Sequence, residues 1–351
     1  MKKLLYFALL LFALSCSAQS GYLPPRDGEN TDPEQTEDRG VAEIPGLPSD
    51  ADTIEVPVHV QFKRDTIIEH YVEFRTGNIP VIISVPHGST VEGGSINGEE
   101  FVLRTKENTG DPSFSTVLDT RTILLADCTD AEFQRKTGKY PYMIIAGIRR
   151  KYVDFNRSKQ YAIPEGSVAN GIAWDTYHDF VKAAKDSVVM KFGTGLLLDF
   201  HGHSHDVKQV ELGYILSSSD LGLSDEALSA NDKYAKKSSI YSLSLKNKNN
   251  LSFVELLRGE FSFGDYLHKA GLPCVPRSKK PAPGDEKYFS GGYINKAHGS
   301  AANVGGTIDA IQLEFDSTAR KSENCEDSAY SLVSAVISYM KKHYYTNAFG
   351  R

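Results

Sequence analysis

Continuous apolar runs, typical of strands that are covered on both faces of a sheet, lie at residues 81–85, 143–148, 196–198 and 308–315. Between these runs, segments 117–127 and 170–192 have apolar residues at helical spacing, and Gly193 follows the second segment as a stop signal. An amphipathic helix is expected at about 327–344. Strands that alternate with helices predict an α/β fold, with a mixed, mostly parallel central sheet flanked by helices.

Two further segments have patterns of their own. Residues 53–74 hold two partly alternating runs separated by residues 63–65, which predicts a hairpin at the edge of the domain. Residues 217–250 are rich in Ser, Lys and Asn, and this composition predicts a surface insertion that is either a lid over the site or a tolerated loop. We expect one α/β domain over residues 53–351.

The first residues have the pattern of an export signal. Residues 1–18 combine two lysines, an apolar run too short to span a membrane, and small residues. Two processing routes stay open, namely lipidation at Cys16 in a sequence that resembles a lipobox, and cleavage after Ala18. Residues 19–52 have the composition of a flexible linker. We expect a periplasmic or outer-membrane or cell-surface lipoprotein, or a secreted protein, that meets a membrane only through a lipid at Cys16.

Charge and cysteine content narrow the classes of function. The chain has 351 residues, with 39 Lys and Arg, 45 Asp and Glu and a net charge of -6, which argues against nucleic-acid binding. Cys128, Cys274 and Cys325 remain after export and permit one disulfide, but their number leaves one unpaired. None is spaced as a cysteine-based zinc site requires.

Ionisable side chains follow three of the apolar runs, at the points where the predicted strands end. His87 comes directly after the first run, with Glu92 five residues later; His201 follows Asp199 after the third run, and Glu314 lies near the end of the last. In an open parallel sheet such strand ends gather along one edge. Two histidines and one glutamate with an open fourth position form the ligand set of catalytic zinc, which leaves Glu314 as general base.

Other polar residues adjoin these strand ends. Arg150, Asn156 and Arg157 interleave with apolar residues after the run at 143–148, and half-buried guanidinium groups suit the recognition of a carboxylate. His203 and His205 follow His201 closely, so either of them competes with His201 as a metal ligand.

Five motifs, taken in order, resemble the N-formylglutamate amidohydrolase family, and they lie between about residues 79 and 320: PHGSTVE, RRKYVDFNR, LDFHGH, FSGGYINKAHG and IQLEF. That family resembles the zinc carboxypeptidases, and the spacing of His87 and Glu92 is also similar to that of poly-γ-glutamate hydrolases. The resemblance implies a zinc-dependent exopeptidase-like fold and one zinc ion held by His87, Glu92 and His201. It further implies the following roles: water activation by Glu314, oxyanion or carboxylate binding by Arg150, Asn156 and Arg157, orientation of a ligand by Asp199, and a place near the substrate for Tyr293 and His298.

The residues and the resemblance together predict an exported zinc amidohydrolase that cleaves an amide in a small molecule or peptide bearing a carboxylate. Family members known for this activity act inside cells, whereas an export signal favours extracellular peptides or γ-glutamyl amides. Two alternatives remain. A non-catalytic surface lipoprotein that binds peptides or metal would have no need of the base Glu314, and a carbohydrate N-deacetylase would act on neutral sugars, which an arginine-rich site does not favour.

Overall fold

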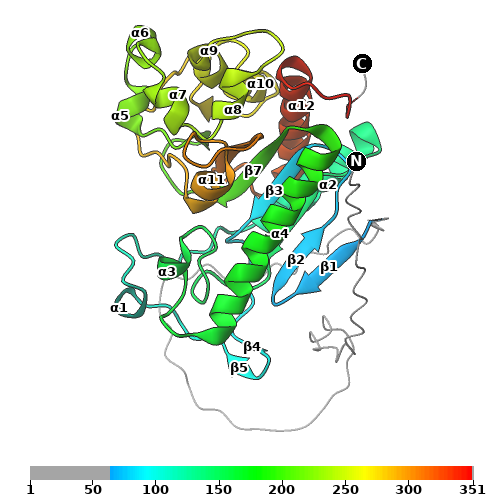
Figure 1. Ribbon diagram of the computed structural model, residues 1–351, viewed down its shortest axis with the longest axis vertical. Coiled ribbons are helices and arrows are strands. Elements are labelled where there is room, and N and C mark those ends of the chain that lie inside the picture. Colours follow the sequence, from blue (N-terminus) through cyan, green and yellow to red (C-terminus); the bar gives the residue numbers. More distant parts are fainter. Residues whose placement is uncertain (1–63, 350–351) are drawn as a thin grey trace, which may run out of the picture. The chain divides into compact units, whose positions relative to one another are not determined.

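An eight-stranded sheet forms the centre of this computed structural model, which describes residues 64–349 (Figure 1). The strand order is β1-β2-β6-β3-β7-β10-β8-β9. The bounds are Thr66–Glu69 for β1, Val72–Arg75 for β2, Val81–Val85 for β3, Tyr142–Ala146 for β6, Gly195–Gly202 for β7, Val210–Gly213 for β8, Cys274–Val275 for β9 and Ile308–Phe315 for β10. Strands β6, β3, β7 and β10 are parallel, whereas β2 and β8 run antiparallel to their inner neighbours. The predicted mixed, mostly parallel sheet with flanking helices is confirmed.

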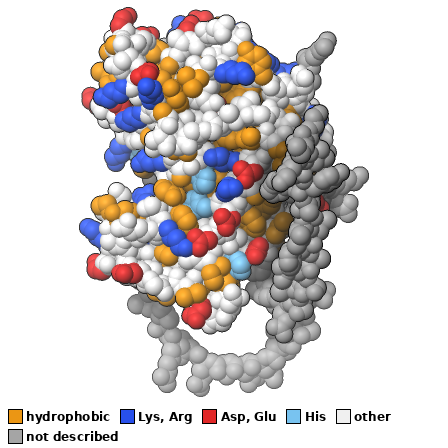
Figure 2. Space-filling view, in the orientation of Figure 1, with side chains coloured by type: hydrophobic (Ala, Val, Ile, Leu, Met, Phe, Trp, Pro, Cys, Tyr) orange, Lys and Arg blue, Asp and Glu red, His pale blue; other side chains and the backbone are white. Residues whose placement is uncertain are grey.

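Three long helices cover the two faces of the sheet: α2 (Thr122–Thr137), α4 (Val168–Phe192) and α12 (Cys325–His343). The short elements are α1 (Lys106–Thr109), α3 (Lys159–Ala162), α5 (Ser218–Leu221), α6 (Asp225–Ser229), α7 (Lys233–Lys237), α8 (Tyr241–Leu245), α9 (Phe253–Arg258), α10 (Phe263–Lys269), α11 (Tyr293–His298), the 3₁₀ turn η1 (Ser322–Asn324) and the small hairpin of β4 (Ser95–Ile96) and β5 (Glu99–Glu100). Over the face in Figure 2, side chains of both charges are interspersed among apolar ones.

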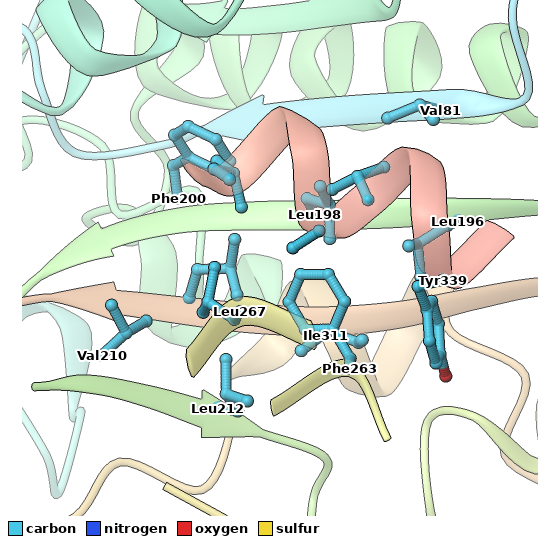
Figure 3. Close-up of a cluster of buried hydrophobic side chains, with 14 of the residues drawn as sticks. Val81, Leu196, Leu198, Phe200, Val210, Leu212, Phe263, Leu267, Ile311 and Tyr339 are labelled. Atoms are coloured by element: carbon cyan, nitrogen blue, oxygen red, sulfur yellow. The ribbon is translucent and has the colours of Figure 1, made fainter. Parts of the chain in front are cut away.

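Successive residues of β7 point to opposite faces, and both faces are covered, which explains why Leu196, Leu197 and Leu198 are apolar without a break. Leu196 and Leu198 pack with α10 and α12 on one face (Figure 3), whereas Leu197 belongs to the apolar cluster under α4. Asp199 and His201 continue the row of Leu197, so the polar end of the strand lies on the face of the sheet that α4 covers.

Several boundaries differ from the sequence-based expectation. The hairpin turns at His70 and Tyr71, inside the second predicted run, and the residues before 64 lie outside the described part. The helix expected from residue 117 begins at Thr122, which leaves Asp119 in the preceding turn. Residues 217–250 contain four short helices, and their apolar residues Leu221, Leu228, Ile240 and Leu243 are buried in the main core.

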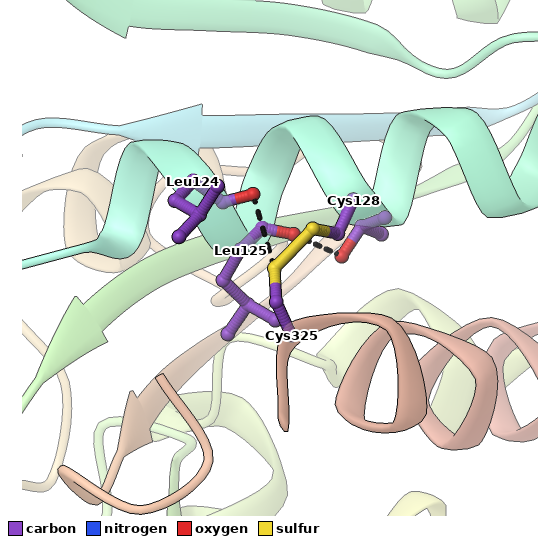
Figure 4. The surroundings of a disulfide bond; sticks show 5 residues. Leu124, Leu125, Cys128 and Cys325 are labelled. Carbon is purple, nitrogen blue, oxygen red and sulfur yellow. Dashed lines mark hydrogen bonds between the residues drawn. A yellow bond between two sulfur atoms is a disulfide. The ribbon is translucent and has the colours of Figure 1, made fainter. Parts of the chain in front are cut away.

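A disulfide joins Cys128 on α2 to Cys325 at the start of α12 (Figure 4), whereas Cys274 is a buried free thiol. The predicted signal at 1–18 and linker at 19–52 lie outside the described residues. Among residues 64–349, none of the helices has the length and apolar character that crossing a membrane requires.

Candidate functional site

The ends of the parallel strands open into a cavity of about 520 Å³. His87 follows β3, His201 lies near the end of β7, Glu314 lies near the end of β10, and Arg150 follows β6. All four line the cavity. The sheet edge therefore brings together residues that are far apart in the sequence, as the strand-end argument predicted.

Strand register aligns three of the ionisable side chains. Glu314 pairs with His201 across the parallel β7–β10 ladder and with Glu211 across the antiparallel β10–β8 ladder. Directly paired residues point to the same face of a sheet. His201, Glu314 and Glu211 thus form a row across three neighbouring strands, and all three are buried.

One buried group has the ligand types of a metal site: His87, Asp119 and His201, whose ligand atoms lie within 4.8 Å of one another. The Oδ2 atom of Asp119 is 3.0 Å from Nδ1 of His201 and 3.5 Å from Nδ1 of His87. Three protein ligands with an open further position are the arrangement of a catalytic rather than a structural zinc site.

Hydrogen bonds on the far side of each imidazole orient both rings toward this point. Nε2 of His87 lies 2.8 Å from Asp154 Oδ1, and Nε2 of His201 lies 2.9 Å from Asp199 Oδ2. A carboxylate accepts, so each Nε2 carries a proton. Nδ1 of His201 also donates to Asp119 Oδ2 at 3.0 Å and would have to lose that proton to bind a cation. Among the described residues, the buried Nδ1 of His87 has no hydrogen-bond partner. A buried acceptor of this kind fits a cation, and carboxylates behind ligating histidines are usual in metal sites.

Glu92, the expected third protein ligand, does not join this group. Its side chain is 45% exposed and makes ion pairs with Arg149 and Lys151. These two cations hold the pKa of Glu92 below its usual value. The spacing of His87 and Glu92 predicted that Glu92 lies beside the two histidines. In the structure Asp119 lies there instead, so Asp119 replaces Glu92 as the candidate third ligand.

The backbone places Asp119 between the ends of two strands. Its N–H donates to the carbonyl of His87, and its own carbonyl accepts from Thr122 at the start of α2. Gly88 permits this approach, because a Cβ there would lie 2.6 Å from Thr122 Oγ1. Burial raises the pKa of Asp119, but the hydrogen bond with His201 and the interaction with the nearby His87 outweigh it and hold the pKa well below the usual range. Asp119 is therefore an anion in the folded protein.

Glu314 lies beside the metal-ligand group but outside it. The side chain is buried, and burial together with neighbouring carboxylates raises the pKa of Glu314 to about 8 in the metal-free protein, although His201 opposes this. The Oε1 atom of Glu314 accepts a hydrogen bond of 2.9 Å from the side-chain amide of Gln312. The side-chain oxygen of Gln312 accepts in turn from the N–H of Gly292. The carboxyl group of Glu314 is thus fixed in place, and its pKa lies near neutral pH, as a general base requires.

Arg150, Asn156 and Arg157 all line the cavity. Within residues 64–349, the Arg150 guanidinium hydrogen-bonds through Nε to Asp154, so its two terminal nitrogens keep their donors for a ligand. Asn156 is almost fully buried and accepts from the N–H of Ile294. Arg157 binds Asp111 and the carbonyl of Ser113, which places it at the cavity wall rather than at the metal-ligand group.

Tyr293 and His298 do not line the cavity, contrary to the sequence-based expectation. Both lie on α11 and face α4, where His298 hydrogen-bonds His178 at 2.8 Å and the Tyr293 ring lies 5.4 Å from that of His178. The preceding glycines reach the cavity instead. A Cβ at Gly292 would lie 2.2 Å from the Asn156 amide, so this close approach requires glycine.

His203, His205 and Glu211 form a second group of potential ligands next to the first. Both ring nitrogens of His203 are already engaged, Nε2 with the carbonyl of Gln209 and Nδ1 with the N–H of His205. This leaves His205 and Glu211 without a third free ligand. Of the three histidines, His201 is the one that lies with His87 and Asp119, and it stays the predicted ligand.

Sequence reasoning missed Asp119 and the role of Asp154. Asp119 had been placed within a helix, because its neighbours continue a helical pattern. Asp154 stands two residues before Asn156 in the motif RRKYVDFNR, where apolar and polar residues alternate. This alternation could have predicted that Asp154 and Asn156 point to the same side.

Comparison with family models finds no match, and none of the curated proteins matches the chain. Solved structures do resemble it. The N-formylglutamate amidohydrolase from Ralstonia eutropha JMP134 aligns with 13% identity and a TM-score of 0.42, over 77% of this chain and 97% of that one. The N-acetylmuramyl-L-alanine amidase Ami1 from Mycobacterium abscessus aligns with 9% identity and a TM-score of 0.28, over 74% and 98%. A putative metallopeptidase from Shewanella amazonensis SB2B aligns with 10% identity and a TM-score of 0.30, over 80% and 82%. The first of these three proteins carries the name of the family whose motifs the sequence resembles.

Proposed function

We propose that this chain is a zinc-dependent amidohydrolase that cleaves an amide bond in a substrate bearing a carboxylate. One observation carries the proposal. His87 and His201 each have a carboxylate behind Nε2, and both present Nδ1 to Asp119, beside the buried acid Glu314.

The proposed cofactor follows from the ligand types. Two imidazole nitrogens and one carboxylate suit zinc, and the hydrogen bonds of Asp154 and Asp199 hold the imidazoles in the tautomer that binds it. When bound, zinc supplies a Lewis acid that polarises an amide carbonyl and lowers the pKa of water.

The protein's own groups then perform the proton transfers and stabilise charge. Glu314 takes a proton from the attacking water at its carboxylate and passes it to the departing amine, since a fixed carboxyl group of this kind serves as base and then as acid. The free donors of Arg150 are available to the oxygen atom that becomes negative, as in an oxyanion hole. Arg157, at the wall, suits a carboxylate on the substrate.

Export belongs to the same proposal. The signal-like segment 1–18 supports a site of action outside the cytoplasm, with lipidation at Cys16 or cleavage after Ala18 as the two processing routes. An extracellular site of action favours peptide-derived amides or γ-glutamyl amides as substrates.

The test measures hydrolysis of N-acyl amino acids, γ-glutamyl peptides and N-acetylated sugar oligomers by the zinc-loaded protein. Glu314→Gln is expected to lower kcat by about 10²–10⁴-fold with unchanged zinc content, because it removes the proton acceptor and no metal ligand. Glu323→Gln is the matched control, since that side chain is 67% exposed. Undiminished activity of Glu314→Gln would contradict the mechanism. Turnover restricted to the sugars would replace the substrate class with that of an N-deacetylase.

A further inference from the structure

An aromatic surface lines one side of the cavity. Phe289 is 45% exposed although it lies at a cavity wall, and the imidazole of His205 stacks on it with ring centroids 4.8 Å apart and an angle of 25° between the planes. We call these two rings the aromatic wall. Covering exposed aromatic surface in a concave site is favourable, so the aromatic wall is suited to contact with a ligand.

One buried carboxylate fixes the ring of His205 and the backbone of Phe289. Glu211 is only 1% exposed, and its two oxygens accept one hydrogen bond each, from Nδ1 of His205 and from the N–H of Phe289, both at 2.7 Å. The flanking residues are also fixed, since Tyr288 donates to the carbonyl of Leu212 and the N–H of Ile215 donates to that of Ser290. The aromatic wall is therefore preorganised, which reduces the entropy lost on binding.

The strand order sets where this wall lies relative to the reacting groups. Glu211 is on β8, two strands from His201 on β7, or about 10 Å at the usual strand spacing. Arg150 follows β6, on the opposite side of His87 and His201. A substrate with its amide beside His87 and His201 and its carboxylate at Arg157, on the loop after β6, can therefore extend its remaining part toward the aromatic wall on the β8 side.

The size of the cavity agrees with a substrate that extends this far. At about 520 Å³ it falls within the range of roughly 300–1,000 Å³ of pockets that enclose ligands larger than a single amino acid.

We propose that Phe289 and His205 form a subsite for an apolar, preferably aromatic, group on the far side of the cleaved amide from the substrate's carboxylate. This assignment rests on the proposed function, which sets the direction in which the substrate lies. The substrates are then amides that join an apolar group to an anionic one.

The test measures binding, so that it does not depend on turnover. Zinc-loaded Glu314→Gln protein is titrated calorimetrically with N-acetyl-L-glutamate and N-phenylacetyl-L-glutamate, which differ only in the acyl group. We expect the Kd of the phenylacetyl compound to be about 10-fold lower or more, since apolar contacts of this size discriminate by such factors. Adding Phe289→Ala should abolish the difference, and Phe289→Leu should retain part of it.

Phe261→Ala in the same background is the matched control, because Phe261 is 42% exposed but does not line the cavity. Equal affinity for the two compounds, or a preference that survives Phe289→Ala, would overturn the subsite. Failure of the proposed function is seen separately, as absence of hydrolysis by the zinc-loaded protein with Glu314 intact.

Discussion

The histidines of the cavity differ in where their hydrogen bonds go. His87 and His201 each donate from Nε2 to a buried carboxylate, and the Nδ1 of each faces Asp119. His203 uses both nitrogens for backbone groups. The residue types alone do not distinguish these cases, because the tautomer of an imidazole is set by the partner of its other nitrogen.

Asp309 is a single buried acid that makes the stability of the fold depend on pH. It accepts from Ser300, from Tyr344 and from the N–H of Leu243, and burial raises the pKa of Asp309 to about 6 from its usual 3.8 despite these bonds. The folded state therefore binds a proton more tightly than the unfolded state does. Stability is highest below about pH 4 for this group and falls as pH rises to about 6.

We predict that this titration lowers the free energy of unfolding by about 2 kcal/mol between pH 4 and pH 7, at 1.36 kcal/mol for each pKa unit. Urea unfolding of metal-free wild type and Asp309→Asn across this range measures it. The difference in unfolding free energy between the two proteins should change by that amount in favour of the variant as pH rises. A difference that does not depend on pH would contradict the prediction.

At the scale of elements, the apolar runs located the inner strands well. Strands β3, β7 and β10 lie where continuous burial predicted them, and α4 ends at Gly193 as expected. These elements are readable because a segment buried on both faces must be apolar at every position except where it carries a task. Asp199 and Glu314 are such positions.

The parts that could not be predicted depend on contacts between distant segments. Asp119 stands in a turn whose position is set by the carbonyl of His87 and by the start of α2, and neither contact is visible in the local pattern. Glu92 has the expected residue type at a plausible spacing, but Arg149 and Lys151 pair with it at the surface. Spacing along the chain limits which residues can reach the histidines, but tertiary packing decides that Asp119, and not Glu92, lies beside them.

The disulfide between α2 and α12 gives a prediction for these two helices. It links residues 197 positions apart, so it restricts the unfolded chain strongly. The double variant Cys128→Ser, Cys325→Ser should lose about 2–5 kcal/mol of unfolding free energy, as measured by urea denaturation. Reductant should destabilise the wild type by a similar amount and leave the double variant unchanged. Equal stability of oxidised wild type and double variant would show that the bond contributes little.

At the scale of the whole molecule, the sheet explains how a site arises from dispersed residues. Helices on both faces bury the strands, and the ionisable groups of the site gather at the edge where β6, β3, β7 and β10 end and β8 begins. Arg150, His87, His201, Glu314 and Glu211 follow the order of β6, β3, β7, β10 and β8 along this edge. The order places cationic groups at one end, the metal-ligand group in the middle and the aromatic wall at the other end.

The central claim is that His87, Asp119 and His201, and not Glu92, hold one zinc ion. Zinc content of the purified protein, measured by mass spectrometry after dialysis, tests it most directly with Asp119→Asn beside Glu92→Gln. We predict about one zinc per chain in wild type and Glu92→Gln, and loss of zinc in Asp119→Asn, because the amide lacks the charge that a zinc ligand supplies. Zinc lost from Glu92→Gln and retained by Asp119→Asn, or absent from the wild type after zinc is added, would contradict it.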